Sequence, residues 1–396
     1  MFQFHVQSQN FADAMRKISI AIPPASEKGE NDGIKLAFYK NVEKVNKSIG
    51  LFLAFDGKIQ AVSSLEIMDV TADEEVIEVH VNGKKAEAAA YAFAAMNTVL
   101  EIIIDKDVKI SGAGSQITLQ MCQQIVALKQ NELPLQEIEM NKEDFVSFAN
   151  FASSCYGMER GNRGLHCVAI RIDAKQKKMC AVSSNGSRCA YAETDKFVLK
   201  PIAKKKGQEA KSNTMEENDE RPLTVVIEGK QLRNAVKNLT KKKILVGIDK
   251  KKIRIKSGTD VIMILTQDVS YPTDTIIQVM NKGKKTGAWK TNLSKIYQAL
   301  AIYEVTMESP WLQVSKKGDS QICFQGKDKL TNAAVVCAQQ GEIDTVKIDE
   351  RELKNGLSVF DKDKEIIVET SSSELPIILR QHEDDPNRIA VFLLSE

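Results

Sequence analysis

The side chains that could act as nucleophiles or bind a metal are scattered along this sequence. The seven cysteines form no Cys-x-x-Cys pair and the four histidines share no spacing, so neither a zinc ribbon nor thioredoxin chemistry is predicted. One catalytic hypothesis remains, a cysteine nucleophile in which Cys155 or Cys167 works with His166. Such partners are normally brought together by the fold, and Cys155 ends an apolar helical face, so buried free thiols are the simpler interpretation.

The glycines do not form a nucleotide-binding motif. Neither Gly-x-x-x-x-Gly-Lys-Ser/Thr nor Gly-x-Gly-x-x-Gly after a strand occurs, so no cofactor and no metal is expected. Residues 157–164 are instead a glycine-rich loop that carries Arg160 and Arg163. Two interpretations stay open for this loop, an ordinary surface loop or a contact to a phosphate backbone.

Cations on predicted helices give a second chemical signal. Over residues 230–239 the apolar residues have the spacing of a buried helix face, and Lys230, Arg233 and Lys237 fall on the opposite face. For one helix a solvated face explains this pattern, but several such helices indicate a basic surface that binds phosphates without reading bases. The other predicted helices that carry cations span residues 10–18, 84–100 and 350–360.

These helices belong to a unit that recurs six times. A short alternating strand is followed by an amphipathic helix and then by further strands, which predicts a β-α-β-β-β unit. Asn or Asp precedes the helix in every copy but the fourth, as helix N-caps do. The six copies begin with strands at residues 2–6, 77–81, 137–140, 223–227, 288–290 and 345–348.

Each unit is too small to fold alone. Six units in 396 residues leave about 66 residues each, so pairs of units are expected to share a core. The predicted class is α+β, with helices on one face of antiparallel sheets in three similar domains at residues 1–134, 135–280 and 281–396. The charged residues 203–221 are expected to form a surface loop inserted in the second domain.

Composition excludes several classes of protein. Lys and Arg total 55 and Asp and Glu total 53, a net charge of +2, which excludes a uniformly cationic protein but allows segregated charge. The longest apolar run, residues 88–96, is far short of the ~20 residues of a membrane helix, and no signal peptide is visible. The odd number of cysteines also favours a reducing compartment, so a cytoplasmic location is expected.

Several segments resemble the bacterial β sliding clamps, the processivity factors of DNA polymerase III. Residues 181–190 (Ala-Val-Ser-Ser-Asn-Gly-Ser-Arg-Cys-Ala) are similar to the family's Ala-Thr-Asp-Gly-His-Arg-Leu-Ala segment. Residues 271–274 (Tyr-Pro-Thr-Asp) resemble its Phe-Pro-Asp-Tyr linker, and residues 389–394 resemble its apolar Val-Val-Met-Pro-Met tail. Residues 64–66 (Ser-Leu-Glu) look like its Asp-Leu-Glu strand. The resemblance covers nearly the whole chain in order.

The sequence also departs from the family pattern. Ser395 and Glu396 end the chain where the family usually has Arg-Leu, and the family's Asn-x-Leu-Pro-Ile segment has no clear counterpart within residues 34–50. Residues 204–220 are an additional insertion. A divergent clamp is therefore the expectation, with the peptide specificity of its groove in question.

The resemblance implies a function without catalysis. Two copies would close head to tail as a homodimeric ring of six DNA-clamp domains, with the helices lining a hole around duplex DNA. Positions matching DNA contacts of the family are Arg160, Arg163 and Lys230. A groove between the second and third domains would bind short linear peptides of polymerase, clamp loader and repair proteins. Its residues would be Ser184, Gly186, Ser187, Arg188, Cys189, Pro272, Ile276, Ile277, Ala390, Phe392 and Leu394.

Two other functions stay open. The chain could be a repeat-built cytosolic scaffold for protein interactions, related to clamps but not enclosing DNA. The second is the cysteine-dependent cytosolic enzyme described above. For a clamp, a bacterial cytoplasmic location at the nucleoid is implied.

Overall fold

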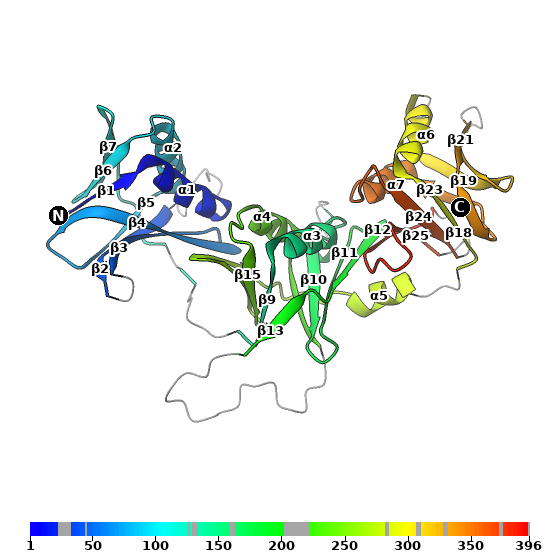
Figure 1. Ribbon diagram of the computed structural model, residues 1–396, viewed down its shortest axis with the longest axis horizontal. Helices are drawn as coiled ribbons and strands as arrows, with labels where there is room; N and C mark the ends of the chain where they lie inside the picture. Colours follow the sequence, from blue (N-terminus) through cyan, green and yellow to red (C-terminus); the bar gives the residue numbers. More distant parts are fainter. Residues whose placement is uncertain are drawn as a thin grey trace. The chain divides into compact units, whose positions relative to one another are not determined.

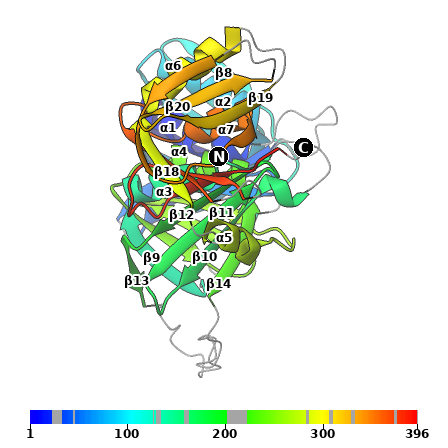
Figure 2. The same cartoon turned by 90° about the vertical axis from the view of Figure 1, so that its right-hand side faces the viewer.

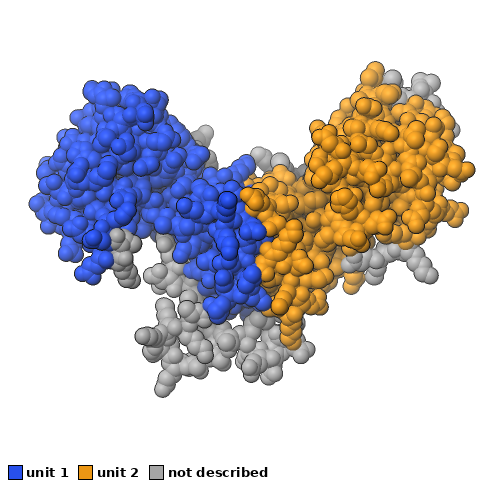
Figure 3. Space-filling view, in the orientation of Figure 1, with its two compact units in different colours: residues 1–142, 198–218, 234–266 blue, residues 143–197, 219–233, 267–396 orange. Residues whose placement is uncertain are grey.

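Two compact units divide the chain in this computed structural model (Figure 3). Unit 1 comprises Met1–Lys142, Val198–Asn218 and Asn234–Thr266, and unit 2 comprises Glu143–Phe197, Asp219–Arg233 and Gln267–Glu396. Each unit takes part of the predicted second domain, so the division into three domains stays a prediction. The structure describes residues 1–22, 33–43, 46–125, 127–128, 134–157, 163–201, 222–281, 285–305, 310–327, 332–371 and 375–394.

All six predicted β-α-β-β-β repeats are present (Figure 1). The first two are β1(Phe2–Gln7), α1(Ser8–Ile18), β2(Gly33–Val42), β3(Lys47–Phe55), β4(Ile59–Ala72), and β5(Val76–Asn82), α2(Gly83–Ala94), β6(Val99–Ile104), β7(Val108–Gly112), β8(Ser115–Leu119). The next two are β9(Gln136–Asn141), α3(Lys142–Ala152), β10(Cys167–Asp173), β11(Lys178–Ser184), β12(Arg188–Thr194), and β14(Leu223–Glu228), α4(Gly229–Lys237), β15(Lys243–Ile248), β16(Lys252–Ser257), β17(Asp260–Leu265). The last two are β18(Gly287–Asn292), α6(Leu293–Val305), β19(Trp311–Lys317), β20(Gln321–Gly326), β21(Asn332–Val336), and β23(Val346–Asp349), α7(Glu350–Leu357), β24(Glu365–Thr370), β25(Ile377–Arg380), β26(Arg388–Val391).

Additional short elements lie between the repeats. Two are strands, β13(Phe197–Lys200) and β22(Ala338–Gly341), and one is the helix α5(Thr273–Asn281). The sequence interpretation treated the α5 residues as a linker. The α+β class with mostly antiparallel sheets is confirmed. No described helix is long and apolar enough to cross a membrane.

Unit 1 is built on one 13-stranded sheet, which follows the order β13-β9-β15-β16-β17-β4-β1-β6-β7-β8, with β2, β3 and β5 attached beside β4. Antiparallel pairing of β17 with β4, where Val261 lies opposite Val62, joins the fourth repeat to the first. The strand β4 has 14 residues, which is long enough to pair with β1, β3 and β17.

Unit 2 contains a nine-stranded and a four-stranded sheet. The larger follows the order β14-β10-β11-β12-β26-β25-β24-β18-β22, and the smaller follows β21-β20-β19-β23. The join in the larger sheet is the pairing of β12 with β26, where Cys189 lies opposite Ala390. The helix α5 packs on β11 and β12, as Figure 2 shows at its lower centre.

Helix starts agree with the predicted caps in part. Asn82 accepts a hydrogen bond from the Lys85 amide before α2, and Asp349 accepts from two amides before α7. The prediction is wrong for the first helix, because α1 begins at Ser8 and Asn10 lies inside it. There the Ser8 amide donates to the Thr98 carbonyl oxygen (2.9 Å), so a neighbouring segment supplies the acceptor that a cap would provide.

A buried ion pair reinforces the join in unit 1. The Asp260 carboxylate on β17 is only 7% exposed as a residue and lies 2.9 Å from Lys17 Nζ on α1. Its Oδ1 also accepts a hydrogen bond from Ser63 Oγ on β4 (2.8 Å). One carboxylate therefore connects a helix with both strands of the join, and Lys17 is directed at Asp260 rather than at solvent.

We expect Asp260→Ala to destabilise unit 1 by about 3 kcal/mol, because it leaves a largely buried ammonium group without its partner. For a unit of this size that corresponds to a Tm lower by roughly 6–12 °C, measurable by scanning calorimetry of the full chain.

The control for Asp260→Ala is Glu66→Ala, which removes the half-exposed ion pair between Lys47 Nζ and Glu66 (2.6 Å). Exposed pairs contribute about 0–1 kcal/mol, so Tm should hardly move. Equal shifts for the two variants would contradict the assigned role of Asp260.

Candidate nucleic-acid and peptide interfaces

The helix α4 carries the clearest basic face of the described helices. Leu232, Ala235 and Val236 are buried, whereas Lys230 and Lys237 on the opposite side are exposed. No Asp or Glu lies within Gly229–Lys237, so these cations have no acidic neighbour on their own helix. The predicted division of this helix into an apolar and a cationic face therefore agrees with its burial pattern.

Arg233 on the same helix is half-buried and held in place. Its Nε donates to Ser153 Oγ (3.2 Å), and its guanidinium carbon lies 5.0 Å from the centre of the Tyr156 ring. Arg233 is thus less free than Lys230 or Lys237, although the sequence pattern treats the three alike.

The glycine-rich loop is described only at its ends. The Gly157 amide donates to the Leu165 carbonyl oxygen (2.5 Å), which closes the base of the loop. Arg160 lies outside the described residues. Arg163 begins a short 3-10 helix, Arg163–His166, and its side chain is not described. Their contact with DNA stays a prediction.

Several cations on the other helices are paired with carboxylates. Arg16 pairs with Asp13 on α1 (3.2 Å), and Lys84 pairs with Glu87 on α2 (2.9 Å). Lys354 on α7 pairs with Glu304, the penultimate residue of α6. Together with Lys17, these pairs reduce the positive charge on α1, α2 and α7. Among the described residues, exposed cations without an ion-pair partner also remain on other helices, namely Lys85 on α2, Lys295 on α6 and Arg351 on α7. The helix α4 differs from these helices in having no acidic residue of its own.

The turn between β11 and β12 is the first part of the predicted peptide site. Asn185 Oδ1 accepts from the amides of Ser187 (3.0 Å) and Arg188 (2.6 Å), and the hydroxyl of Ser184 accepts from the Gly186 amide (3.1 Å). Gly186 has φ +93°, a conformation that glycine adopts without strain. These interactions fix the turn and leave Gly186 and Ser187 exposed.

The chain's last strand lies beside this turn. After β26, the Phe392 amide donates to the Ser187 carbonyl oxygen (3.0 Å). One apolar cluster of unit 2 then contains Cys189, Ile276 and Ala390 as buried members, with Ile277 and Phe392 half-buried against it. The structure therefore brings together residues from the turn, the α5 segment and the tail, as the resemblance implies.

Two predicted residues lie at the margin of this cluster. Pro272 is exposed just before α5. Leu394 is 36% exposed, and its amide donates to the Lys347 carbonyl oxygen (2.9 Å). Neither residue belongs to the described apolar cluster.

Arg188 has a different environment from the one that the resemblance suggests. It is only 8% exposed, and its Nε donates to Glu352 Oε2 on α7, an oxygen that also accepts from Asn185 Nδ2 (3.1 Å). The guanidinium is thus neutralised beneath the turn. Its contribution is to hold the turn against α7, and a bound peptide would meet no free cation there.

Sequence reasoning missed several members of the cluster. Val269 and Tyr271 precede α5, Met280 is buried on it, and Cys180 lies on β11. A helical signal was present, because Pro272 and Asp274 suit a helix start and Ile276 and Met280 are four residues apart. Burial raises the pKa of Tyr271.

The thiols named in the catalytic hypothesis are buried. Cys167 is buried, and burial raises the pKa of the fully buried Cys155 to about 12. Such a thiol stays protonated at neutral pH, whereas a cysteine nucleophile reacts as the thiolate. Burial likewise raises the pKa of Cys189 to about 11. Cys155, Cys167 and Cys189 are therefore apolar packing residues in this fold.

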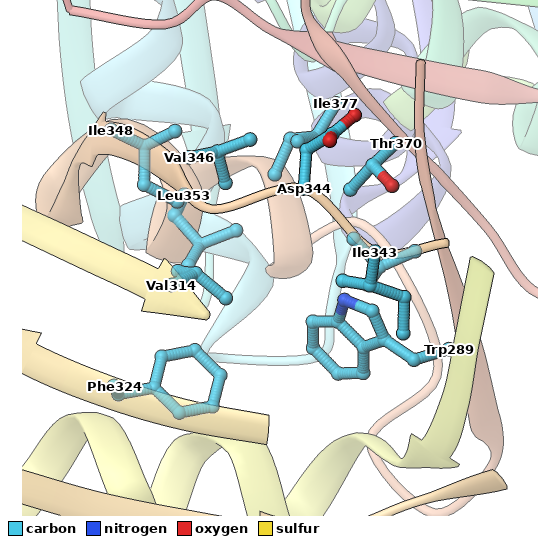
Figure 4. A pocket seen from close by; sticks show the side chains of 11 residues that line it. Trp289, Val314, Phe324, Ile343, Asp344, Val346, Ile348, Leu353, Thr370 and Ile377 are labelled. Atoms are coloured by element: carbon cyan, nitrogen blue, oxygen red, sulfur yellow. The ribbon is translucent and has the colours of Figure 1, made fainter. Parts of the chain in front are cut away.

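A small cavity lies in the core of unit 2 (Figure 4). Trp289, Val314, Phe324 and Ile343 are among the side chains that line it, and its volume is about 10 Å³. That volume corresponds to about one water molecule, so the cavity has no room for a substrate. Among the described residues, no group of three His, Cys, Asp or Glu side chains could hold a metal ion.

Comparisons with known proteins agree with this geometry at the level of structure. The sequence matches no protein-family model and no curated protein. A Pseudomonas aeruginosa sliding clamp (DNA polymerase III subunit beta) solved with griselimycin matches with a TM-score of 0.82 and 10% identity, covering 100% of both chains. The Bacillus subtilis DNA polymerase sliding clamp matches at 0.78 and 14%, covering 100% of this chain and 99% of that one.

A third match is the Helicobacter pylori β clamp bound to a DNA ligase peptide, with a TM-score of 0.76 and 12% identity over 99% of this chain and 100% of that one. The likeness extends through all six repeats, although few residues are shared. The chain therefore has the fold of the bacterial DNA polymerase III β sliding clamps.

Proposed function

We propose that this protein is a divergent DNA sliding clamp, a ring that encircles duplex DNA without sequence preference and tethers polymerase and other replication or repair proteins. The observation that carries the proposal is the agreement with clamp structures over the whole chain. Encirclement of DNA requires only weak contacts to phosphates and no catalytic groups. We therefore propose that the protein is a processivity factor and not an enzyme.

The DNA contacts are proposed on the loop and helix of the third and fourth repeats. Lys230, Arg233 and Lys237 lie on α4, and Arg160 and Arg163 belong to the loop after α3. Lys230 lies in the first turn of α4, where a cation opposes the helix dipole by about 0.3–1 kcal/mol. A phosphate contact would explain why Lys230 is kept at this position, which is unfavourable for the helix and gives Lys230 no ion-pair partner among the described residues.

A homodimer is proposed from the sheet edges. In the part of the chain that the structure describes, β8 and β21 each end a sheet, so one edge of each strand has no neighbouring strand. Exposed apolar side chains lie at both edges. Tyr91 is on α2, which packs beside β8; Ile302 is on α6, which packs beside β21, and Val336 is on β21 itself. Pairing of β8 in one copy with β21 in a second copy would satisfy these edges and, made twice, would close a ring.

The apolar cluster around Cys189, Ile276 and Phe392 is the proposed peptide site. The Helicobacter pylori clamp binds a DNA ligase peptide, and here the corresponding partners are proposed to be short motifs of polymerase and clamp loader. Because Arg188 is already neutralised, apolar contacts and backbone hydrogen bonds would dominate recognition. A protein with this function works at the nucleoid in a bacterial cytoplasm.

Retention on DNA tests encirclement directly. The protein is assembled at high concentration with a nicked circular plasmid, and free protein is removed by gel filtration in moderate salt. A ring should stay with the circle and leave once the plasmid is linearised, because only topology holds it. Blocking both ends of the linear DNA with biotin and streptavidin should restore retention. Equal loss from circular and open linear DNA would exclude encirclement.

A scaffold that does not enclose DNA is the second candidate. It is favoured by the pairing of Arg16, Lys17, Lys84 and Lys354 with carboxylates, which reduces the positive charge on α1, α2 and α7. The retention experiment separates the two functions. A scaffold would bind peptides but would show no difference between circular and linear DNA.

The peptide site makes a separate prediction. Replacing Phe392 and Leu394 together by Ala should abolish binding of a polymerase-derived peptide, with Phe392→Ala alone weakening it at least ~10-fold, as for an interface hot spot. Fluorescence anisotropy of the labelled peptide measures the affinity, and sedimentation confirms that the oligomer is unchanged. Leu199→Ala is a matched control, because Leu199 is also 36% exposed but lies on β13 in unit 1. Unchanged affinity in the double variant would refute this site.

A further inference from the structure

Arg233 is set apart from the other cations of α4 by the groups that hold it. Its Nε donates to Ser153 Oγ (3.2 Å), and Ser153 is itself fully buried and donates to the Ala149 carbonyl oxygen (2.7 Å). The acceptor for Arg233 is therefore fixed by the last turn of α3. A solvated surface arginine needs no such anchor.

The ring of Tyr156 forms a second support. It lies 5.0 Å from the guanidinium carbon of Arg233, within the range of a cation–π interaction. The ring is placed by Gly229, the first residue of α4, because a Cβ at that position would lie 2.6 Å from Tyr156 Cδ1. Only glycine lets the aromatic ring approach the start of the helix this closely.

These contacts leave the two terminal nitrogens of the Arg233 guanidinium available to bind a ligand. The guanidinium carries five N–H donors, and the contact to Ser153 occupies the one on Nε. Among the described residues no carboxylate pairs with Arg233, and Lys230 lies one turn away on the same face. The two terminal nitrogens keep the fork geometry that binds phosphate oxygens.

We propose that Ser153 and Tyr156 are positioning residues that hold the guanidinium of Arg233 ready for a DNA phosphate. This inference rests on the proposed function and adds to it a preformed contact. An unrestrained arginine loses much side-chain freedom when it binds, whereas here folding of α3 against α4 has already fixed the side chain. The backbone phosphate is the ligand, so the contact carries no sequence preference.

A double-mutant cycle tests the inference with the full-length protein and a fluorescent duplex at several salt concentrations. Tyr156→Ala should weaken duplex binding about 5-fold, whereas Tyr156→Phe, which keeps the ring, should stay within about 2-fold of the wild type. Arg233→Ala should lower the slope of log affinity against log salt by about 1. In the Arg233→Ala background, Tyr156→Ala should have no further effect.

The cycle distinguishes positioning from a general structural role. If Tyr156→Ala weakens binding equally with and without Arg233, or not at all, the inference is overturned while the clamp proposal stands. A wild-type protein without salt-dependent duplex binding would overturn both. Ser153→Ala provides a second variant if Tyr156→Ala does not fold. Its expected loss of about 2-fold should also vanish in the Arg233→Ala background, and persistence there would likewise overturn the inference.

Discussion

Unpaired sheet edges are the constraint on which this structure depends. Each β-α-β-β-β repeat ends in strands whose backbone amides and carbonyls must find partners. In unit 1 the pairing of β4 with β17 meets this need, and in unit 2 the pairing of β12 with β26 does so. A buried ion pair accompanies each join, Lys17 with Asp260 in the first and Arg188 with Glu352 in the second. In both pairs a helix is linked to one of the joined strands.

The candidate peptide site is a consequence of the second join. Because β26 extends along β12, the chain that follows it must pass the turn at Ser187, where the Phe392 amide finds its acceptor. The helix α5 packs on β11 and β12, and its Ile276 and Met280 belong to the same apolar cluster as Ala390. Three segments distant in sequence therefore form one apolar cluster, the one proposed above to bind an extended peptide with apolar side chains.

The repeats were predictable because local periodicity specifies them. The alternation of buried and more exposed residues in strands such as β1 and the spacing of apolar residues in α4 depend on residues close together in sequence. The capping of α7 by Asp349 is local in the same way. The joins were not predictable, since the register of β17 on β4 is set by contacts between residues about 200 positions apart. For the same reason Lys17 looks like a surface lysine in sequence, although its partner is the remote Asp260.

The candidate site likewise combines features that could be predicted from the sequence with features that depend on contacts between distant residues. The turn, α5 and tail residues could be assembled only through the resemblance; the structure brings Cys189, Ile276, Ile277, Ala390 and Phe392 into one cluster, while their binding of a peptide stays a prediction. The charge environment of Arg188 could not be foreseen, because Glu352 belongs to another repeat. Division into three domains and the DNA contacts of Arg160 and Arg163 stay predictions.

Closure of a ring is the central proposal, and it requires a second copy that pairs with β8 and β21, each of which ends a sheet among the described strands. Sedimentation equilibrium over a range of micromolar protein concentrations measures the mass in solution and so shows most directly whether a second copy is bound. A ring of two copies predicts a mass of twice 44.0 kDa. A single species of 44.0 kDa across that range would leave both edges unpaired and would contradict the clamp proposal.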